Sequence, residues 1–327
     1  MKAQQTPKVA ILLATYNGAR FIKLQICSLK ENATPFTLHW LDDHSNDNTR
    51  DVVRSSACSA SIELAEWHQP KHLGLPSSFF QLLECVEADI YLFCDQDDIW
   101  QPGKIDATVA NLIDDIASPV LCFSDSLMFN DNNPEVFRFA SKMTGRKKSA
   151  KALHVPQTLS TFTSIVAPGH TQGFTRPVRE IFLRHKAIAH EYAFMHDWWI
   201  HDITIASGTV RMLSNAPTAL WRQHAESFCA NLGGSVRSGV TKNWQSIQYW
   251  RRIKSRHAQG FVLSASTLPL DRNEGRLHSI AQLSASLDRR QTPAALIRLA
   301  RHGAMPQSLY GAALFSIACL CSDATSS

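Results

Sequence analysis

The strongest constraint on this 327-residue chain is a regular alternation of short apolar runs and helical segments over its first 124 residues. Each run is too short for a helix and ends in a polar segment, as strands do. Strand–helix repeats of this kind indicate a parallel sheet with helices on its faces. The expected strands are residues 9–14, 38–41, 61–67, 90–94 and 120–124, and the expected helices are residues 18–30, 46–57, 76–87 and 102–116.

Polar and acidic side chains follow every expected strand at the point where the strand ends. The loops after parallel strands emerge at one edge of the sheet, where open α/β folds bind ligands. We therefore expect a binding site along this edge. The polar segments are residues 15–17, 42–45, 71–74 and 95–98, followed by Asp125.

The stretch Asp95-Gln96-Asp97-Asp98 is the most informative of these loops. Neighbouring carboxylates can turn toward one divalent cation, and hard oxygen ligands suit Mg²⁺ or Mn²⁺. Three carboxylates beside a buried strand are costly unless a cation neutralises them. The alternative is an acidic cap for the helix that begins near Pro102, although one aspartate suffices for capping. We favour the cation site.

Three further acidic residues are candidates for function. Asp42 and Asp43 stand at a strand end, where a carboxylate can accept the imino N–H of a pyrimidine ring, although turn and cap chemistry also suits this segment. Asp197, in His196-Asp197-Trp198, is the candidate general base, because apolar neighbours raise a carboxyl pKa toward a useful range. A helix N-cap role fits Asp197 too, and the two roles can coexist, but we favour the base.

Composition limits the class of protein. Hydrophobic residues make up 44% and charged residues 19%, which supports a sizeable core and argues against disorder. The eight cysteines show no CxxC pair and fit a reducing compartment. The apolar run at residues 9–14 is too short for a signal-peptide core, and no stretch reaches the length of a membrane span. We expect a cytoplasmic protein with no nucleic-acid partner.

Positive charge is concentrated near the C-terminus. The net charge is +5, and residues 237–302 carry twelve Lys and Arg against three Asp and Glu. Such a segment suits an anionic partner, either the inner face of the plasma membrane or a phosphorylated acceptor. A solvated basic face, or packing against the rest of the chain, explains it equally well.

Six motifs carry a family resemblance, and they occur in one order. Together they resemble family 2 glycosyltransferases of the GT-A fold, most closely the bacterial rhamnosyltransferase-like members that build surface polysaccharides. The resemblance covers roughly residues 8–228. The motifs are VAILLATYNGARFIKLQICSL, LDDHSNDNT, HLGLPSSFFQLL, YLFCDQDDIWQPGKI, HDWW and WRQH.

The resemblance implies an α/β fold with a mixed, mostly parallel sheet flanked by helices. It implies a catalytic domain over residues 1–228, with a donor-binding half at about 8–125 and an acceptor half at about 126–228. Residues 229–327 would form a helical, basic extension. The implied cofactor is a divalent cation, Mg²⁺ or Mn²⁺.

Site roles also follow from the resemblance, position by position. The nucleotide would be lined by Thr15, Tyr16 and Asn17, and its pyrimidine base would be bound by Asp42, with Asp43 beside it. The ribose or a metal-bound water would be contacted by Asp95, and the metal would be bound by Asp97 and His224. The general base would be Asp197, and the residues near the acceptor would be Gly169, His196 and Trp198. Taken alone, His224 would be read as a structural histidine. The chain departs from the family pattern at His44, His72, Ser78, His170 and Gln172.

The expected activity is inverting transfer of a sugar, with rhamnose the first choice, from a dTDP- or UDP-linked donor. The acceptor would be a glycan or a lipid-linked glycan. One alternative is an inactive nucleotide-sugar-binding assembly partner, which the presence of both Asp97 and Asp197 argues against. Another is a nucleotidyltransferase, but the segment ATYNGAR after the first strand is not the basic, Gly-rich phosphate loop that this class would need.

Overall fold

The structure is a computed structural model that divides into two compact units. The first unit contains the sheets, and the second is described only in short helical pieces and loops. The units are residues 1–155, 167–186 and 195–222, and residues 156–166, 187–194 and 223–327. The structure describes residues 6–131, 133–138, 153–154, 167–213, 218–224, 256–257, 259–261 and 263–264.

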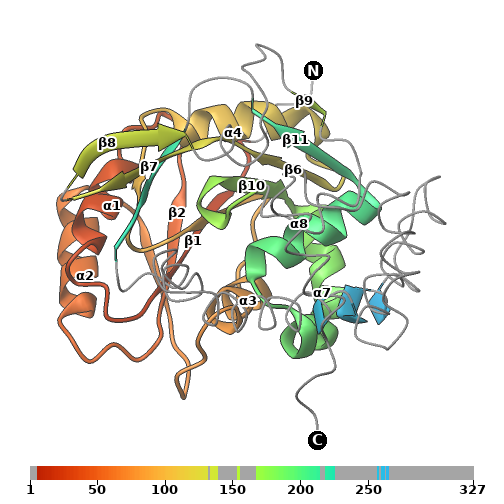
Figure 1. Cartoon of the computed structure of the whole chain (residues 1–327), viewed down its shortest axis with the longest axis horizontal. Helices are drawn as coiled ribbons and strands as arrows, with labels where there is room; N and C mark the ends of the chain where they lie inside the picture. Colours follow the sequence, from red (N-terminus) through yellow and green to blue (C-terminus); the bar gives the residue numbers. More distant parts are fainter. Residues whose placement is uncertain are drawn as a thin grey trace, which may run out of the picture. The chain divides into compact units, whose positions relative to one another are not determined.

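An eight-stranded mixed sheet forms the centre of the first unit (Figure 1). Neighbouring strands are parallel in four pairs, β3–β2, β2–β1, β1–β4 and β6–β11. Strand β10 lies antiparallel between β4 and β6, and β9 is antiparallel to β11. The expected mixed, mostly parallel sheet is thereby confirmed. In spatial order the strands are β3 (Leu64–Trp67), β2 (Thr37–Asp42), β1 (Val9–Thr15), β4 (Ile90–Cys94), β10 (Gln172–Thr175), β6 (Val120–Phe123), β11 (Thr209–Met212) and β9 (Leu153–His154).

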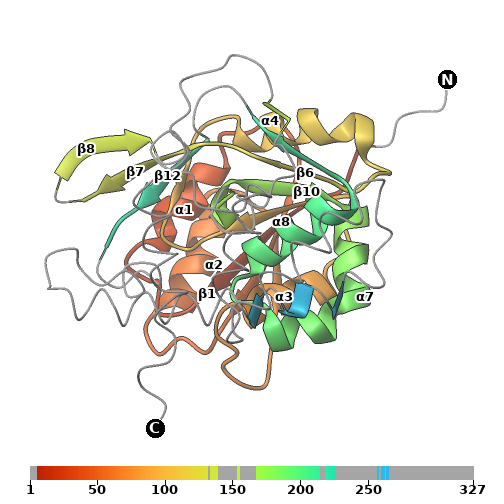
Figure 2. The same cartoon turned by 45° about the vertical axis from the view of Figure 1, so that its right-hand side comes forward.

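Helices cover this sheet (Figures 1 and 2). Helix α1 packs beside α2, α3 lies against β1, β2 and α8, and α4 lies against β6 and β10. The first four begin between one and four residues later than their sequence patterns suggested. The helices are α1 (Ile22–Leu29), α2 (Thr49–Ser59), α3 (Ser77–Cys85), α4 (Lys104–Leu112), α7 (Arg176–Tyr192) and α8 (His196–Ser207), with short 3₁₀ turns η1 (Ile113–Asp115) and η2 (Gly169–Thr171).

The central strands are buried on both faces, which explains their unbroken apolar sequences. In β1, Ile11, Leu12 and Leu13 have no exposed surface, and the same is true of Leu92 and Phe93 in β4. At about 25 cal/mol for each Å² of apolar surface buried, these strands supply a large share of the stability. Because that rigid layer ends at Thr15 and Cys94, the loops that follow start from fixed points.

A second, smaller sheet lies beside the acidic loop. It has the order β5–β12–β7–β8 and begins directly after Asp98. Strand β12 pairs with β5 on one side and β7 on the other, so a late segment of the chain reaches the acidic loop. The strands are β5 (Ile99–Trp100), β12 (Ala219–Arg222), β7 (Ser126–Asn130) and β8 (Asn133–Arg138).

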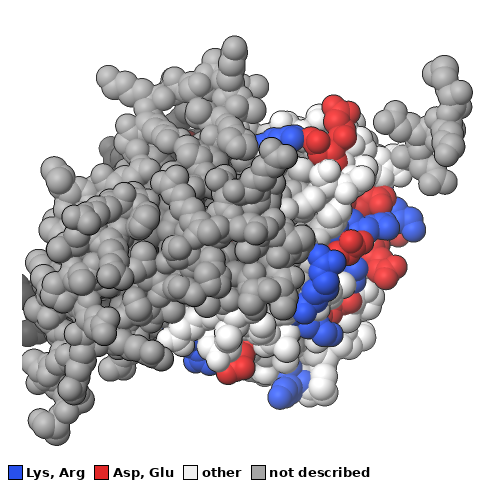
Figure 3. All heavy atoms as spheres, turned by 90° about the vertical axis from the view of Figure 1, so that its right-hand side faces the viewer, with Lys and Arg blue, Asp and Glu red and all other residues white. Residues whose placement is uncertain are grey.

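Most of the C-terminal third lies outside the described residues. The expected helical extension, the domain boundary at 228 and the basic segment 237–302 therefore stay predictions. In the second unit, the backbone N–H of Phe194 donates to Nδ1 of His257, and Arg256 donates to the carbonyl of Glu191. No helix in the described part of the chain is long and apolar enough to cross a membrane. On the described part of the face shown in Figure 3, Lys and Arg residues are mixed with Asp and Glu residues.

Candidate active site

The expected site residues gather at one edge of the large sheet. Strands β1, β2 and β4 are parallel, so Thr15, Asp42 and Asp95 all follow carboxyl ends at this edge. Strand β10 runs the other way, with Gly173 opposite Leu92 of β4. Its amino end therefore arrives at the same edge and brings the turn η2 with it.

Asp42 is a buried carboxylate that holds the surrounding loops together. It accepts hydrogen bonds from Oγ1 of Thr15 (3.1 Å), from the backbone N–H (3.0 Å) and hydroxyl (2.6 Å) of Ser45, and from Nε of Arg50 (2.7 Å). Burial would raise the pKa of Asp42, but the hydrogen bonds from Ser45 and Arg50 together outweigh it and lower the pKa. The carboxylate is thus kept ionised.

Asp43 organises the loop between β3 and α3. Its carboxylate accepts the backbone N–H groups of Leu73 and Gly74, both at 2.7 Å, and the hydroxyl of Ser78 at 3.1 Å. Nδ1 of His72 lies 3.1 Å from the same carboxylate. His72 and Ser78 are two of the family departures, and both contact Asp43. A third departure, His44, has a φ of 65° and reaches the carbonyl of Gln69.

The loop after β1 is locked to the acidic loop by a two-point contact. The amide of Gln96 accepts the backbone N–H of Tyr16 (2.9 Å) and donates to its carbonyl (3.1 Å). Asn17 adopts a left-handed backbone with φ of 48°, and its side chain accepts the backbone N–H of Asn46. The Tyr16 ring is 44% exposed and lies 4.6 Å from that of His72.

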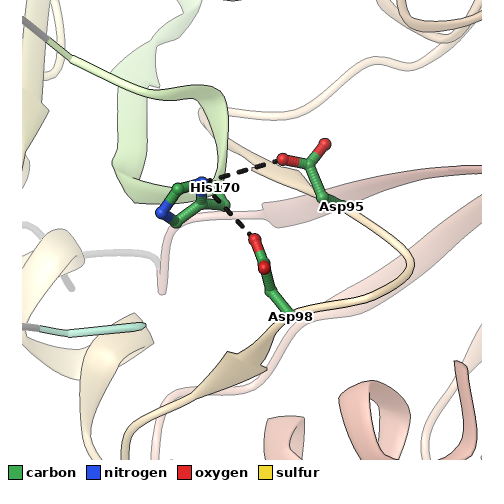
Figure 4. A group of neighbouring side chains, drawn as sticks. All are labelled: Asp95, Asp98 and His170. Carbon is green, nitrogen blue, oxygen red and sulfur yellow. Dashed lines mark ion pairs between the residues drawn. The ribbon is translucent and has the colours of Figure 1, made fainter. Parts of the chain in front are cut away.

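The acidic loop and η2 bring three possible metal ligands together (Figure 4). Nδ1 of His170 lies 3.4 Å from Oδ2 of Asp98 and 3.8 Å from Oδ2 of Asp95. Asp98 and His170 are buried, whereas the side chain of Asp95 is 33% exposed. Two carboxylate oxygens and one imidazole nitrogen form a donor set that divalent cations accept.

Burial sets the charges of this cluster. It raises the pKa of Asp95 to about 8, with further contributions from the charges of Asp97 and Asp197. Burial likewise holds the pKa of Asp98 well above its usual value and that of His170 well below. The alternative role as a helix cap is not seen at α4, whose N-cap is Gly103 and has no side-chain cap.

Two buried basic residues support the acidic loop, and the charge of Lys104 offsets part of the rise in the pKa values of Asp95 and Asp98. The backbone N–H of Arg222 donates to Oδ1 of Asp98 (2.9 Å), and its Nε donates to the carbonyl of Asp97 (2.8 Å). Nζ of Lys104 donates to the carbonyl of His170 and lies 3.9 Å from the centre of the Trp100 ring. Burial lowers the pKa of Lys104 to about 7.

Asp197 lies at the start of α8 and faces the same region. Its carboxylate accepts the backbone N–H of Gly169 (2.8 Å) and of Trp198 (2.9 Å). Burial raises the pKa of Asp197 to about 6 even though these bonds oppose the rise. Its charge in turn contributes to the raised pKa of Asp95, so the two carboxylates are close enough to interact. Gln172 fixes the segment by donating to the carbonyl of Asp197.

The side chains expected near the acceptor differ in exposure. His196 is 2% exposed, and its ring lies 3.9 Å from that of Phe79 and 4.6 Å from that of Phe93. Burial lowers its pKa to about 3, which keeps the ring uncharged. Trp198 is partly exposed and Gly169 is buried. Their roles toward an acceptor stay predictions.

The sequence did not single out Asp98 or His170 as site residues. Asp98 was part of the acidic motif, and His170 was noted only as a departure from the family pattern. The signal that could have found them is the antiparallel strand at 172–175, which returns the preceding turn to the end of β4. The expected ligand His224 falls in the second unit, and its role stays a prediction.

Comparison with known proteins finds glycosyltransferases. Residues 10–163 match the model of Glycosyl transferase family 2. The dTDP-rhamnosyl transferase RfbG of Shigella flexneri is 25% identical over 221 residues, which cover 65% of this chain and 71% of RfbG. An uncharacterised glycosyltransferase of Nostoc sp. is 27% identical over 103 residues, 31% of this chain and 32% of that protein.

Solved structures show the fold. TarS 1–349 from S. aureus, in complex with UDP-GlcNAc, has a TM-score of 0.54 at 15% sequence identity. The match covers 95% of this chain and 90% of the TarS chain. A longer TarS chain is covered over 46% of its length. The mannosyltransferase PcManGT from Pyrobaculum calidifontis, in complex with GDP-Man and Mn²⁺, has a TM-score of 0.51 at 18% sequence identity. The match covers 96% of this chain and 80% of the PcManGT chain.

Proposed function

We propose, from the match of residues 10–163 to the model of Glycosyl transferase family 2, that the chain transfers a sugar from a nucleotide diphosphate to an acceptor hydroxyl, inverting the anomeric carbon. Rhamnose is the first donor to test, because the relative RfbG is a dTDP-rhamnosyl transferase. UDP-sugars come next, because TarS was solved with UDP-GlcNAc. The acceptor is a glycan or a lipid-linked glycan.

The observation that carries the proposal is the position of Asp197. A carboxylate with a pKa of about 6, beside the acidic loop, is suited to take a proton from a hydroxyl near neutral pH. The backbone N–H groups of Gly169 and Trp198 fix its orientation. A group held this way is organised before the acceptor arrives, which lowers the cost of reaching the transition state.

The reaction is a direct displacement. Asp197 removes the acceptor proton as the acceptor oxygen bonds to the anomeric carbon, and the bond to the diphosphate breaks on the opposite face. A divalent cation bound at the acidic loop would stabilise the negative charge that collects on the leaving diphosphate. Lys104 and Arg222 hold the chain segments that form this loop.

The nucleotide lies over the loops after β1, β2 and β3. Thr15, Tyr16 and Asn17 supply one side, and the exposed ring of Tyr16 offers an apolar face. For Asp42 to bind the base, one of its carboxylate oxygens has to lose a present partner, because it already accepts hydrogen bonds from Thr15, Ser45 and Arg50. Arg50, whose side chain is 47% exposed, is the partner that can move away and leave an oxygen for the base.

The test measures nucleotide release and the product together. We expect dTDP release from dTDP-rhamnose, or UDP release from a UDP-sugar, with an inverted anomeric centre in the product seen by NMR. Asp197→Asn should lower turnover by about 10²- to 10⁴-fold, the usual contribution of a general base, while donor binding persists. The matched control is Asp114→Asn, an exposed aspartate in η1, which should leave turnover unchanged.

Two results would contradict the proposal. Full turnover in Asp197→Asn would remove Asp197 from the mechanism. Release of a sugar 1-phosphate in place of a nucleoside diphosphate would indicate nucleotidyl transfer instead.

A further inference from the structure

Helix α8 carries a buried histidine and a second buried carboxylate just beyond Asp197. Nδ1 of His201 lies 3.1 Å from Oδ1 of Asp202, and both side chains are 5% exposed. Nε2 of His201 is also buried, and it has no hydrogen-bond partner. Burying two ionisable groups is costly, and a purely structural pair would use every polar atom. The unpartnered nitrogen therefore calls for another role.

The fold places His201 beside the proposed base. His201 and Asp197 are four residues apart on one helix, a spacing that puts their Cβ atoms about 5–6 Å apart on the same face. The His201 ring also lies 6.5 Å from that of Phe123, which ends β6. Strand β10 is antiparallel to both β4 and β6, so these two strands end at the same edge of the sheet. His201 thus lies at the edge that carries the acidic loop.

The charge of His201 acts on Asp197. Burial raises the pKa of Asp197 to about 6, and the N–H groups of Gly169 and Trp198 oppose that rise. The charge of His201 opposes it as well. An imidazole has this influence only in its protonated form, and a carboxylate at hydrogen-bond distance favours that form. Asp202 supplies this carboxylate.

The titratable groups on the neighbouring elements have other partners. Helix α8 packs against β6, β11, α3 and η2 (Figures 1 and 2). Among the described residues, Asp202 is the carboxylate that pairs with His201. The other groups are Cys122 of β6 (near the Thr108 carbonyl), Arg211 of β11 (paired with Asp115), Glu84 and Cys85 of α3 (contacting Lys186 and Gln81), His170 of η2 (beside Asp95 and Asp98) and His196 of α8 (stacked on Phe79).

We propose that His201, held in its protonated form by Asp202, is a positioning residue that keeps the base Asp197 ionised. The inference rests on the proposed function, because it takes Asp197 as the base. It adds a buried charge pair that extends sugar transfer to lower pH. Without the positive charge, burial alone would leave more of Asp197 protonated, and a protonated carboxyl cannot accept the acceptor proton.

The experiment follows the carboxyl carbon of Asp197 by ¹³C NMR against pH, in the full chain, with EDTA and without donor. Asp197→Asn assigns the signal by removing it. The wild type should titrate near pH 6. His201→Gln should raise this midpoint by about 0.5–1 pH unit, because a nearby positive charge is lost.

The same shift should appear in the reaction. In His201→Gln, kcat/KM at pH 5 should fall about 3- to 10-fold, whereas at pH 8.5 it should stay within about twofold of the wild type. The matched control is Thr204→Val on the same helix. It removes a buried hydroxyl that donates to the Ile200 carbonyl but no charge, so it should leave the midpoint in place.

Three results would overturn the inference. The first is an unchanged Asp197 midpoint in His201→Gln, and the second is an equal shift in Thr204→Val. The third needs no variant: ¹⁵N shifts of the wild-type protein should show protons on both ring nitrogens of His201 at pH 5.5, and a ring with one proton there contradicts the proposal.

Failure here can be separated from failure of the proposed function. If the Asp197 midpoint shifts as described but no donor releases its nucleotide, the action of His201 on Asp197 stands and the transferase proposal falls. If the wild type transfers sugar and His201→Gln has the same pH profile, the role of His201 is wrong and the transferase activity stands.

Discussion

The two halves of the site treat their carboxylates in opposite ways. In the loops after β2, Asp42 and Asp43 accept hydrogen bonds from the surrounding chain, and the pKa of Asp42 is lowered despite burial. In the acidic loop and at α8, burial raises the pKa values of Asp95 and Asp197 to about 8 and about 6. The first half is satisfied by the chain itself, whereas in the second Oδ2 of Asp98 is buried and accepts no hydrogen bond.

This contrast separates a half that stabilises the loops from the half in which we propose the chemistry. A carboxylate with a full set of donors adds stability and fixes loop geometry. A buried carboxylate that lacks donors reduces stability until a cation or a proton arrives, and such groups concentrate at functional sites. Stability is thus gained on the nucleotide side and lost on the side where the chemistry is proposed.

The largest effect should come from Asp43. Asp43→Ala removes the acceptor of the Leu73 and Gly74 N–H groups and of the Ser78 hydroxyl. We expect the free energy of unfolding to fall by about 3 kcal/mol, since hydrogen bonds to a charged group contribute about 1.5–3 kcal/mol each and are not additive. Asp97→Ala, in the acidic loop, should not destabilise, because it relieves repulsion with Asp95 and Asp98. If urea denaturation shows the same loss of unfolding free energy for both variants, the difference between the two halves is contradicted.

The next effect is on the pH dependence of transfer. Asp197 acts as a base only when ionised, and its pKa of about 6 lies above the usual value. The value of kcat/KM should therefore rise about tenfold per pH unit up to about pH 6 and then level off, leaving it about 100-fold lower at pH 4. Asp197→Asn should lack this limb. A midpoint near pH 4 in the wild type would show that Asp197 is not perturbed during catalysis.

The sequence predicts the ends of the parallel strands in both halves better than the contacts between distant segments. The parallel strand pattern and the polar residues after each strand locate Thr15, Asp42 and Asp95 at one edge, because local periodicity determines strand ends. The internal hydrogen bonds of Asp42 were also partly anticipated as turn chemistry.

The pairing of distant segments is what the sequence leaves out. His170 reaches Asp98 through an antiparallel strand about 75 residues after β4, and Lys104 is buried under η2 by the same arrangement. No local pattern encodes either contact. The family departures were the nearest signal, since His72, Ser78 and His170 all turn out to contact an acidic residue of the site.

A smaller effect of opposite sign is expected at Asp98. Asp98→Asn keeps the acceptor for the Arg222 N–H and replaces the unpaired oxygen with an amide that faces His170. Because the folded pKa of Asp98 is raised, wild-type stability falls as pH rises above the unfolded value of about 4. At pH 8 in EDTA the variant should be more stable by about 1–2 kcal/mol.

Two conditions sharpen that measurement. At pH 4 the gain should vanish, because Asp98 is then protonated in the folded wild type. Saturating Mn²⁺ should reverse the order, since the ion stabilises only the protein that binds it well. A destabilised variant at every pH would mean that Asp98 is already satisfied in the native protein.

The smallest effect concerns the contact that joins the two halves. A Cβ at Gly18 would lie 2.3 Å from Oε1 of Gln96, so Gly18→Ala should displace this flexible side chain and break its two bonds to Tyr16. Unfolding should change by less than about 1 kcal/mol, because lost exposed hydrogen bonds are partly offset by the lower chain entropy of alanine. The donor KM should rise several-fold as the loops separate.

Gln96→Ala should have the same effect. The double variant should be no worse than either single variant, because both substitutions remove the same contact. Additive effects would mean that Gly18 acts on the nucleotide side independently of the acidic loop.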